Sequence, residues 1–290
     1  PDYTQLTSYK TKAMTRLYSS DDNIIQEYAN EKRVFVPYEA IPKLLVEAFV
    51  VTEDKNFFKH DGLDFKGITR AIIINMKHLI TGNRLVGAST ITQQVAKNFL
   101  LSSEVSFDRK IKEALLALRI ERTLTKEKIL ELYLNEIFLG FRSYGIAVAS
   151  QNYFNKSIDD LDLSEIAFLA GLPKGPNNYH PIKKYNAAIL RRNYVLSRLF
   201  EEGVIGRSDF SKALQKNINI IKNSSNTSIM ANYFSAEVRK IIIKKYDEDY
   251  LYNEGLYVLT TLDEKLQSFA EKSLQNGLEE YDKRQGWRGK

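Results

Sequence analysis

The 290-residue sequence contains no cysteine, which excludes a disulfide framework and a thiolate metal site. It also has no run of about 18 apolar residues, so the printed chain holds neither a spanning helix nor a signal peptide. It begins at Pro1 rather than at a methionine. Two interpretations follow, a soluble protein or a fragment. The absence of cysteine is compatible with the cytosol and with an extracytoplasmic location.

The composition indicates a folded protein with anionic partners. Hydrophobic residues make up 43% of the chain, which is enough for a sizeable core. The excess of 42 Lys and Arg over 36 Asp and Glu gives a net charge of +6. This balance favours nucleic acid, an acidic membrane face or a phosphorylated substrate. The length suggests one principal domain with an appendage.

The stretch 53–62 places two acids, Glu53 and Asp54, beside two aromatic rings, Phe57 and Phe58. A carboxyl group held against apolar rings has its charged form disfavoured, so its pKa rises toward the range in which it exchanges protons near neutrality. Either acid is therefore a candidate catalytic acid or base. The alternative is that the phenylalanines are core residues and the acids lie in water.

Apolar periodicity and capping residues predict a mainly α protein with short β elements. A helical pattern begins at Pro42 and runs to Glu53, which places this acid at a helix C-terminus. Thr125 is the expected N-cap of helix 126–139, in which Asn135 is expected to hold backbone groups. The other expected elements are strands at 23–28, 33–37 and 256–262, helices at 67–80, 105–122, 190–204, 231–245 and 265–283, and helices within 140–181 with Ser164 as an N-cap and Gly171 as a stop.

The segment 67–80 carries Ile72, Ile73, Met76 and Ile80 at helical spacing, which makes most of one face apolar. A helix of this length is too short to span a bilayer. Two interpretations remain open: an ordinary core helix, and an interfacial helix whose apolar face enters the lipid headgroup region.

Residues 87–94 are rich in small hydroxyl and amide side chains, which offer donors to sugar hydroxyls or phosphate oxygens. The same residues are compatible with a helix start that has Ser89 as its N-cap. Both interpretations hold together, because a helix N-terminus also favours anions.

The expected helix 105–122 has an apolar stripe that we expect to be buried, consisting of Phe107, Ile111, Leu115 and Leu118. Arg109, Lys110 and Glu113 lie on another sector. At about 100° per residue, Glu113 lies roughly 40° from Arg109 and roughly 60° from Lys110, so the three can converge on one object. The alternative is an exposed ion pair of small energetic value.

Five segments together resemble, in order and spacing, the peptidoglycan glycosyltransferases (glycosyltransferase family 51), the polymerase domain of class A penicillin-binding proteins. The segments are 53–62, 87–98, 109–113, 126–135, and 153–156 followed by 169–171. The resemblance covers about residues 20–200, and 255–263 and 286–289 resemble flanking parts of class A proteins.

The resemblance implies a mainly α, lysozyme-like fold with a larger head lobe and a small, mobile jaw lobe, which includes 67–80 and lies against the membrane. It implies three regions: 1–20 after a membrane anchor absent from the printed chain, the glycosyltransferase domain 21–206, and 207–290 as a linker with the start of a truncated transpeptidase region. The stretch 217–228 has a linker composition. No Ser-x-x-Lys sequence occurs in the chain, so no transpeptidase activity is expected from it.

The resemblance also implies the reaction, in which two lipid II molecules are joined with inversion at the donor MurNAc and release of undecaprenyl pyrophosphate. Glu53 is implied to be the general base. Glu113 is expected either to orient cations or to hold a divalent ion, Mg²⁺ or Mn²⁺, and no other cofactor is expected. The implied substrate-binding residues are Asp54, Ser89, Gln93, Lys97, Arg109 and Lys110.

The expected partners are lipid II, the growing glycan strand, the membrane surface, a moenomycin-type phosphoglycolipid inhibitor and other cell-wall synthesis proteins, at the extracytoplasmic face of the plasma (inner) membrane. Two alternatives remain. A lysozyme-like hydrolase or lytic transglycosylase also uses a Glu at a helix end but does not need Lys97, Arg109 and Lys110. A basic nucleic-acid-binding module needs cations interleaved with exposed aromatic residues, whereas the aromatic residues here mostly keep core spacing.

Overall fold

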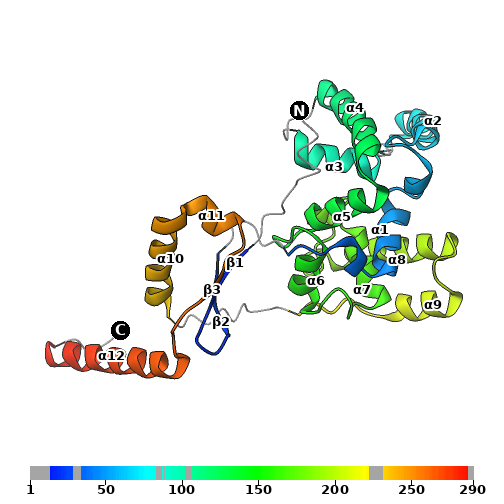
Figure 1. Ribbon diagram of the computed structural model, residues 1–290. Coiled ribbons are helices and arrows are strands. Elements are labelled where there is room, and N and C mark those ends of the chain that lie inside the picture. The colour runs from blue at the N-terminus through cyan, green and yellow to red at the C-terminus, as the bar shows by residue number, and fades with distance from the viewer. Residues whose placement is uncertain are drawn as a thin grey trace. The chain divides into compact units, whose positions relative to one another are not determined.

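The computed structural model describes residues 14–28, 34–82, 87, 89–101, 106–221 and 231–286. The chain divides into two compact units, each with its own hydrophobic core. The helical unit contains the described residues from 34 to 221, and the mixed unit contains 14–28 and 231–286. The fold is mainly α, as expected, and Figure 1 labels its elements.

The helical unit is built around α7 (Leu163–Gly171). Five consecutive apolar residues of this helix, Ile166 to Ala170, are buried, and a helix that is apolar on all sides needs neighbours on all sides. Those neighbours are α1 (Lys43–Glu53), α6 (Ile146–Phe154), α8 (Tyr185–Glu201) and α9 (Arg207–Gln215). Helix α8 begins and ends earlier than the expected 190–204.

Three further helices lie next to this core: α3 (Ile91–Leu100), α4 (Phe107–Thr123) and α5 (Lys126–Glu136). Helix α3 packs against both α4 and α5. Thr125 caps α5 as expected, because its side chain accepts a hydrogen bond from the Lys128 N–H. The helix ends at Glu136 rather than at 139.

The predicted strand at 33–37 is wrong for the described residues 34–37, which form no strand. Asn135 explains this: its Oδ1 accepts from the Val36 N–H at 2.8 Å, and its Nδ2 donates to the Val36 carbonyl at 2.8 Å. A side chain thus satisfies the backbone groups that a strand partner would take. The predicted backbone-holding role of Asn135 is confirmed.

The buried face of α4 differs from the predicted stripe. Ile111 and Leu115 are exposed, whereas the buried residues of α4 are Glu113, Leu116, Ala117 and Ile120. The buried residues also recur at helical spacing, so α4 has two faces that could be buried. Helix α3 packs against α4, and the face with Glu113, Leu116, Ala117 and Ile120 is the buried one. The Phe107 side chain lies outside the described part of the chain.

Two predicted N-caps are wrong. Thr90, not Ser89, caps α3, and Asp162, not Ser164, caps α7; both form capping boxes with the residue three positions later. Gly171 ends α7 as expected.

Helix α2 (Phe65–Thr81) covers the expected 67–80, but it is not a core helix. Among its described side chains, only Gly67 and Ala71 are buried. Ile72, Ile73, Met76 and Leu79 are between 55% and 74% exposed. No helix in the described ranges has both the length and the apolar composition needed to cross a bilayer.

The mixed unit is a three-stranded sheet of order β2-β1-β3 with α10 (Asn232–Tyr246) and α11 (Glu248–Asn253). Strand β1 (Thr15–Tyr18) pairs antiparallel with β2 (Ile24–Tyr28) and parallel with β3 (Tyr257–Leu259). The strand expected at 23–28 is therefore present as β2, but it pairs with β1 and not with the segment 33–37. The sheet joins 15–28 to the C-terminal part of the chain, whereas the expected glycosyltransferase domain began at 21 and ended at 206.

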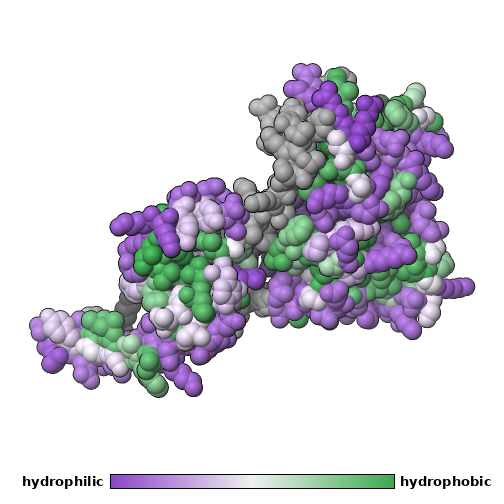
Figure 2. Space-filling view, in the orientation of Figure 1, coloured by the Kyte–Doolittle hydropathy of each residue, from purple (hydrophilic) through white to green (hydrophobic). Residues whose placement is uncertain are grey.

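Helix α12 (Glu264–Arg284) ends the described part of the mixed unit and has no buried residue. Its apolar side chains lie at the surface in Figure 2, and they include Leu266, Phe269, Leu274 and Leu278. The predicted helices at 231–245 and 265–283 and the strand within 256–262 are confirmed. Most of the predicted linker 217–228 and residues 287–289 lie outside the described residues.

Candidate active site

A cavity of about 650 Å³ opens in the helical unit where the C-terminal end of α1 meets α3, α4 and α8. Two acids line it, Glu53 and Glu113. Five cationic side chains line it as well: Lys97, Arg109, Lys110, Lys174 and Arg191. The excess of cations suits an anionic ligand.

Glu53 is the last residue of α1, so the helix holds its side chain at the cavity wall. The side chain is 14% exposed. Gln94 Nε2 donates a hydrogen bond to Oε2 at 3.0 Å, and the Arg191 guanidinium lies 3.8 Å from Oε1. Burial raises the pKa of Glu53 above its ordinary value of 4.5, although Gln94, Arg191 and Lys174 oppose this rise. The carboxyl is therefore prepared to accept a proton.

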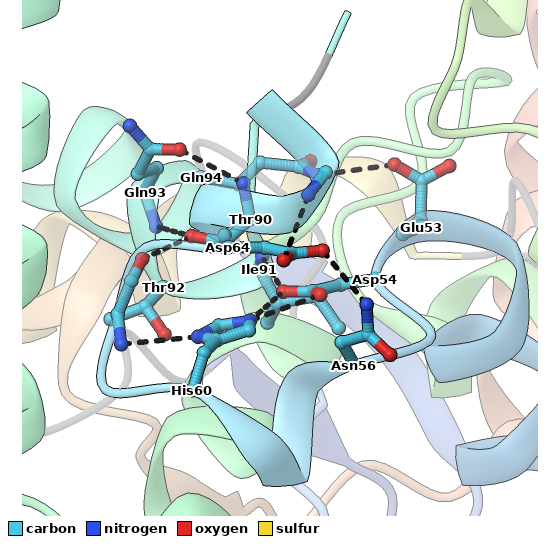
Figure 3. A network of polar contacts seen from close by, with 12 residues as sticks. Glu53, Asp54, Asn56, His60, Asp64, Thr90, Ile91, Thr92, Gln93 and Gln94 are labelled. Carbon is cyan, nitrogen blue, oxygen red and sulfur yellow. Dashed lines mark hydrogen bonds and ion pairs between the residues drawn. The ribbon is translucent and has the colours of Figure 1, made fainter. Parts of the chain in front are cut away.

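Asp54 is buried, so the interpretation in which both acids lie in water is wrong. Figure 3 shows its carboxylate between two donors. His60 Nε2 lies 3.0 and 3.1 Å from its two oxygens, and the Ile91 N–H donates to Oδ2 at 3.0 Å. Because the Gly62 N–H donates to His60 Nδ1, the imidazole proton is on Nε2. Asp54 thus ties the end of α1 to the start of α3, and its contact with substrate stays a prediction.

The first turn of α3 is fixed by a capping box (Figure 3). Thr90 Oγ1 accepts from the Gln93 N–H at 3.2 Å, Gln93 Oε1 accepts from the Thr90 N–H at 3.0 Å, and the Thr90 hydroxyl donates to the Gly62 carbonyl at 2.6 Å. The rigid turn holds Gln94, the next residue, against Glu53.

Glu113 holds two of the cations that line the cavity. It is buried, with Arg109 Nε at 3.2 Å and Lys110 Nζ at 2.6 Å from its two oxygens. Lys110 also donates to Ser89 Oγ at 2.9 Å. The predicted convergence of the three α4 side chains is confirmed, and the interpretation as an exposed ion pair does not hold, because the carboxylate is buried.

A second cavity of about 420 Å³ adjoins the first, and both are lined by Thr52, Glu53, Ser89 and Tyr194. Its other charged lining residues are Asp54, Lys55, Asp64, Arg70 and Arg198. Glu53 therefore lies where the two cavities meet.

The first cavity brings together seven of the eight predicted site residues: Glu53, Ser89, Gln93, Lys97, Arg109, Lys110 and Glu113. Asp54 lines the second. Five further lining residues were not predicted from the sequence: Gln94, Lys174, Tyr179, Arg191 and Tyr194. The sequence offered a reason to include Gln94, because it belongs to the segment 87–94 that is rich in hydroxyl and amide side chains. Nothing in the sequence marked Arg191 as a site residue.

The residues around Glu113 do not fit a divalent ion held by the protein alone. Such an ion takes several oxygen ligands, and the Glu113 carboxylate already pairs with two cations. Within the described residues, no group of three or more His, Cys, Asp or Glu side chains gathers at one point.

The model of the family described as transglycosylase matches residues 21–200 of this chain. The chain belongs to the transglycosylase family. The matched range includes Glu53 and every other predicted site residue.

Other comparisons extend beyond this transglycosylase domain. "Penicillin-binding protein 1A" of Rickettsia felis is 47% identical over 289 residues, covering 99% of this chain and 37% of that protein. The protein of the same name from Escherichia coli K12 is 42% identical, covering 100% of this chain and 34% of that protein. The crystal structure of Penicillin-binding protein 1A from Haemophilus influenzae superposes with a TM-score of 0.56 at 28% identity, covering 97% of this chain and 32% of that one. The transglycosylase chain therefore spans about a third of the length of these relatives.

Proposed function

We propose that this chain is a peptidoglycan glycosyltransferase that polymerises lipid II into glycan strands. The observation that carries the proposal is the position of Glu53, a buried carboxyl with a raised pKa, where a cation-lined cavity meets a second cavity. A donor with a pyrophosphate needs the cations, and an acceptor sugar needs the adjoining space.

In the proposed reaction, Glu53 takes the proton from the C4 hydroxyl of the acceptor GlcNAc. The hydroxyl oxygen attacks the anomeric carbon of the donor MurNAc from the face opposite the leaving group. The bond to the lipid pyrophosphate breaks with inversion, and the pyrophosphate leaves with the bonding electron pair. Burial makes Glu53 a stronger base, while Gln94 and Arg191 keep part of the population ionised and ready to act.

The cations of the first cavity are proposed to stabilise the pyrophosphate as its charge develops. Lys97, Arg109 and Lys110 line this cavity, and Ser89 and Gln93 add polar groups. Electrostatic stabilisation of this kind is strongest where the donors are already in place. We assign Glu113 to this preparation, because its buried carboxylate holds Arg109 and Lys110 before substrate arrives.

The exposed apolar face of α2 is proposed to contact lipid, since the substrate carries an undecaprenyl chain and must be reached at a membrane. Ile72, Ile73, Met76 and Leu79 form this face. An apolar stripe on a helix that does not span is typical of an interfacial helix. The proposed location is the extracytoplasmic face of the plasma membrane.

The decisive experiment follows labelled lipid II in the presence of the full chain. Growth of glycan chains supports the polymerase. Shortening of preformed glycan without growth would indicate a hydrolase or lytic transglycosylase, and binding without a change of length would indicate a binding module. A moenomycin-type phosphoglycolipid is expected to compete, with its phosphate near Lys97, Arg109 and Lys110.

A further inference from the structure

Helix α4 has an apolar stripe that neither the core nor the proposed reaction uses. Ile111 and Leu115 are 47% and 53% exposed, and the half-buried Leu118 continues the stripe at helical spacing. At about 100° per residue, the three side chains lie on the side of α4 opposite its buried face. Contiguous apolar surface of this kind marks a contact with another molecule or with a membrane.

The stripe of α4 continues onto α2. A cavity of about 590 Å³ is lined by Leu118 of α4 and by Phe65 and Lys66, the first two residues of α2. Phe65 and Lys66 also line a hollow of about 530 Å³ together with Ile73 on the exposed side of α2. Figure 1 shows the two helices next to each other in the helical unit. We call this surface the α2–α4 face, and its apolar centre consists of Phe65, Ile73 and Met76 of α2 and Ile111, Leu115 and Leu118 of α4.

The charged side chains of α2 are cationic. The helix contains Lys66, Arg70 and Lys77 and no acidic residue, and all three cations are exposed. At about 100° per residue, they fall within about 40° of one another, and the nearest lies about 20° from Ile73. A basic stripe along the edge of an apolar face is typical of a helix that lies on an anionic lipid surface.

Helix α4 repeats this arrangement. Arg119 and Arg122 are exposed, and they lie about 40° and 20° from Leu115 around the helix. Within the described part of the two helices, Asp108 is the one exposed acid. It lies one turn from Lys112, so the two charges offset each other. Arg119 and Arg122 therefore give the outward side of α4 an excess of positive charge.

The acids that line the 590 Å³ cavity do not cancel these cations. Asp64 is the N-cap of α2 and accepts from the Gly67 N–H at 2.9 Å, and Glu121 pairs with Lys126 at 2.7 Å. The remaining acid is Asp61. It shares the cavity with three cations, Lys59, Lys66 and Arg122.

We propose that the α2–α4 face docks on a bilayer that contains anionic phospholipid, with headgroup phosphates at Lys66, Lys77, Arg119 and Arg122. The inference rests on the proposed contact of α2 with lipid, and it adds α4 to that contact and makes the contact depend on headgroup charge. A bilayer matches both parts of the face, because the apolar centre enters the headgroup region while the long stems of Lys and Arg carry their charges to the phosphates. A second copy of the chain would place like charges opposite each other.

The test measures binding of the full chain to vesicles that contain no lipid II. One set of vesicles is phosphatidylcholine alone, and the other contains about a quarter phosphatidylglycerol. Each basic residue near an anionic surface strengthens binding by about fivefold. We therefore expect the chain to bind the anionic vesicles about tenfold or more tightly than the neutral ones at low ionic strength, and the difference to shrink as salt is added.

Two double variants remove the cations of one helix at a time. Lys66→Gln combined with Lys77→Gln, and Arg119→Gln combined with Arg122→Gln, should each lower the affinity for anionic vesicles by about ten- to thirtyfold. The affinity for neutral vesicles should stay unchanged. The four side chains are exposed, so circular dichroism and the melting temperature should stay native.

The matched control removes the same charge elsewhere in the helical unit. Arg207→Gln combined with Lys212→Gln changes exposed residues of α9, which lies away from α2 and α4 in Figure 1, and should bind both kinds of vesicle as wild type does. Ile111→Gln combined with Leu115→Gln tests the apolar part. It should weaken binding to both kinds of vesicle, because it removes apolar contact and leaves the charge in place.

Equal binding of wild type to neutral and anionic vesicles would overturn the proposal. So would an equal loss in the α9 control, which would indicate net charge alone, or wild-type binding in both α4 variants. Sedimentation of the chain without vesicles covers a second copy as the occupant: a dimer that the Ile111 and Leu115 variant abolishes would overturn the proposal. Binding to polyglutamate but not to vesicles would also overturn it, and would indicate an acidic protein partner.

The outcome is separate from that of the proposed function, because vesicle binding needs no turnover. A chain that polymerises nothing but shows the expected vesicle binding refutes only the polymerase. A chain that polymerises lipid II in detergent but binds the two kinds of vesicle equally refutes only the docking surface.

Discussion

Replacing Glu53 with glutamine removes the proton acceptor while keeping the size of the side chain. General base catalysis contributes roughly 10²- to 10⁴-fold to a rate, so we expect Glu53→Gln to lower the initial rate of lipid II polymerisation by about two orders of magnitude or more. Affinity for a moenomycin-type inhibitor should stay within a few fold, because the phosphate contacts are assigned to Lys97, Arg109 and Lys110 at another part of the cavity.

Glu113→Gln is the matched variant, because it makes the same chemical change at the other acid of the cavity. It leaves Arg109 and Lys110 without their common carboxylate. A hydrogen bond to a charged group is worth roughly 1.5 to 3 kcal/mol, which corresponds to about a ten- to hundredfold effect. We therefore expect turnover and inhibitor affinity to fall together by that factor, as measured with labelled lipid II and a fluorescent inhibitor.

The stability of Glu53→Gln provides an independent readout. Burial raises the folded-state pKa of Glu53 above 4.5, so the stability associated with its protonated form is present below that value and is lost as the pH rises through the folded-state pKa. Glutamine stays neutral throughout. The variant should therefore melt at a higher temperature than wild type at about pH 8, and the difference should vanish near pH 4.

Three results would refute this reasoning. Polymerisation by Glu53→Gln at a near wild-type rate would remove Glu53 as the base. Equal loss of inhibitor binding in the two variants would remove the division of roles between Glu53 and Glu113. A lower melting temperature of Glu53→Gln at about pH 8 would show that the buried charge is compensated in the folded state.

Further predictions concern lipid, cations and the Asp54 contacts. Ile73→Glu combined with Met76→Glu should weaken binding to liposomes and leave the circular dichroism spectrum native. Leu190→Glu, at an even more exposed apolar position on α8, should not weaken this binding. Unchanged binding in the double variant would exclude α2 as the lipid contact. Lys97→Ala should lower turnover by about one to two orders of magnitude. The control is Lys112→Ala, which changes an exposed residue of α4 outside the cavity and should leave turnover unchanged. Equal rates in the two variants would contradict the assignment of Lys97. Asp54→Asn should lower the free energy of unfolding by about 1 to 3 kcal/mol, because the amide NH2 that replaces one carboxylate oxygen cannot accept from the His60 Nε2–H. Exposed Asp61→Asn is the control, and equal thermal denaturation of the two variants would show that the network contributes nothing.

The sequence by itself determined the elements whose signals are local. Helical periodicity and the proline before it located α1 and placed Glu53 at its C-terminal end, and the order of five motifs identified the family. The i to i+4 spacing was enough to bring Arg109 and Glu113 together, since neighbouring turns of one helix always bring such a pair close. The sequence predicted that a hydroxyl side chain caps α3, but not which one. Ser89 and Thr90 both carry a hydroxyl, and the residue at which the helix begins decides between them.

The tertiary structure decided what depends on a distant partner. Strand 24–28 was visible in the sequence, but its pairing with 15–18 was not. Nor was the pairing of 15–18 with 257–259, because these segments lie far apart in the chain. The burial of Glu113 and the exposure of Ile111 followed from how α3 packs on α4, which no periodicity within α4 specifies. Arg191 comes to Glu53 from α8 for the same reason: an amphipathic pattern says that a helix has a buried side, and only the packing of its neighbours says which atoms that side meets.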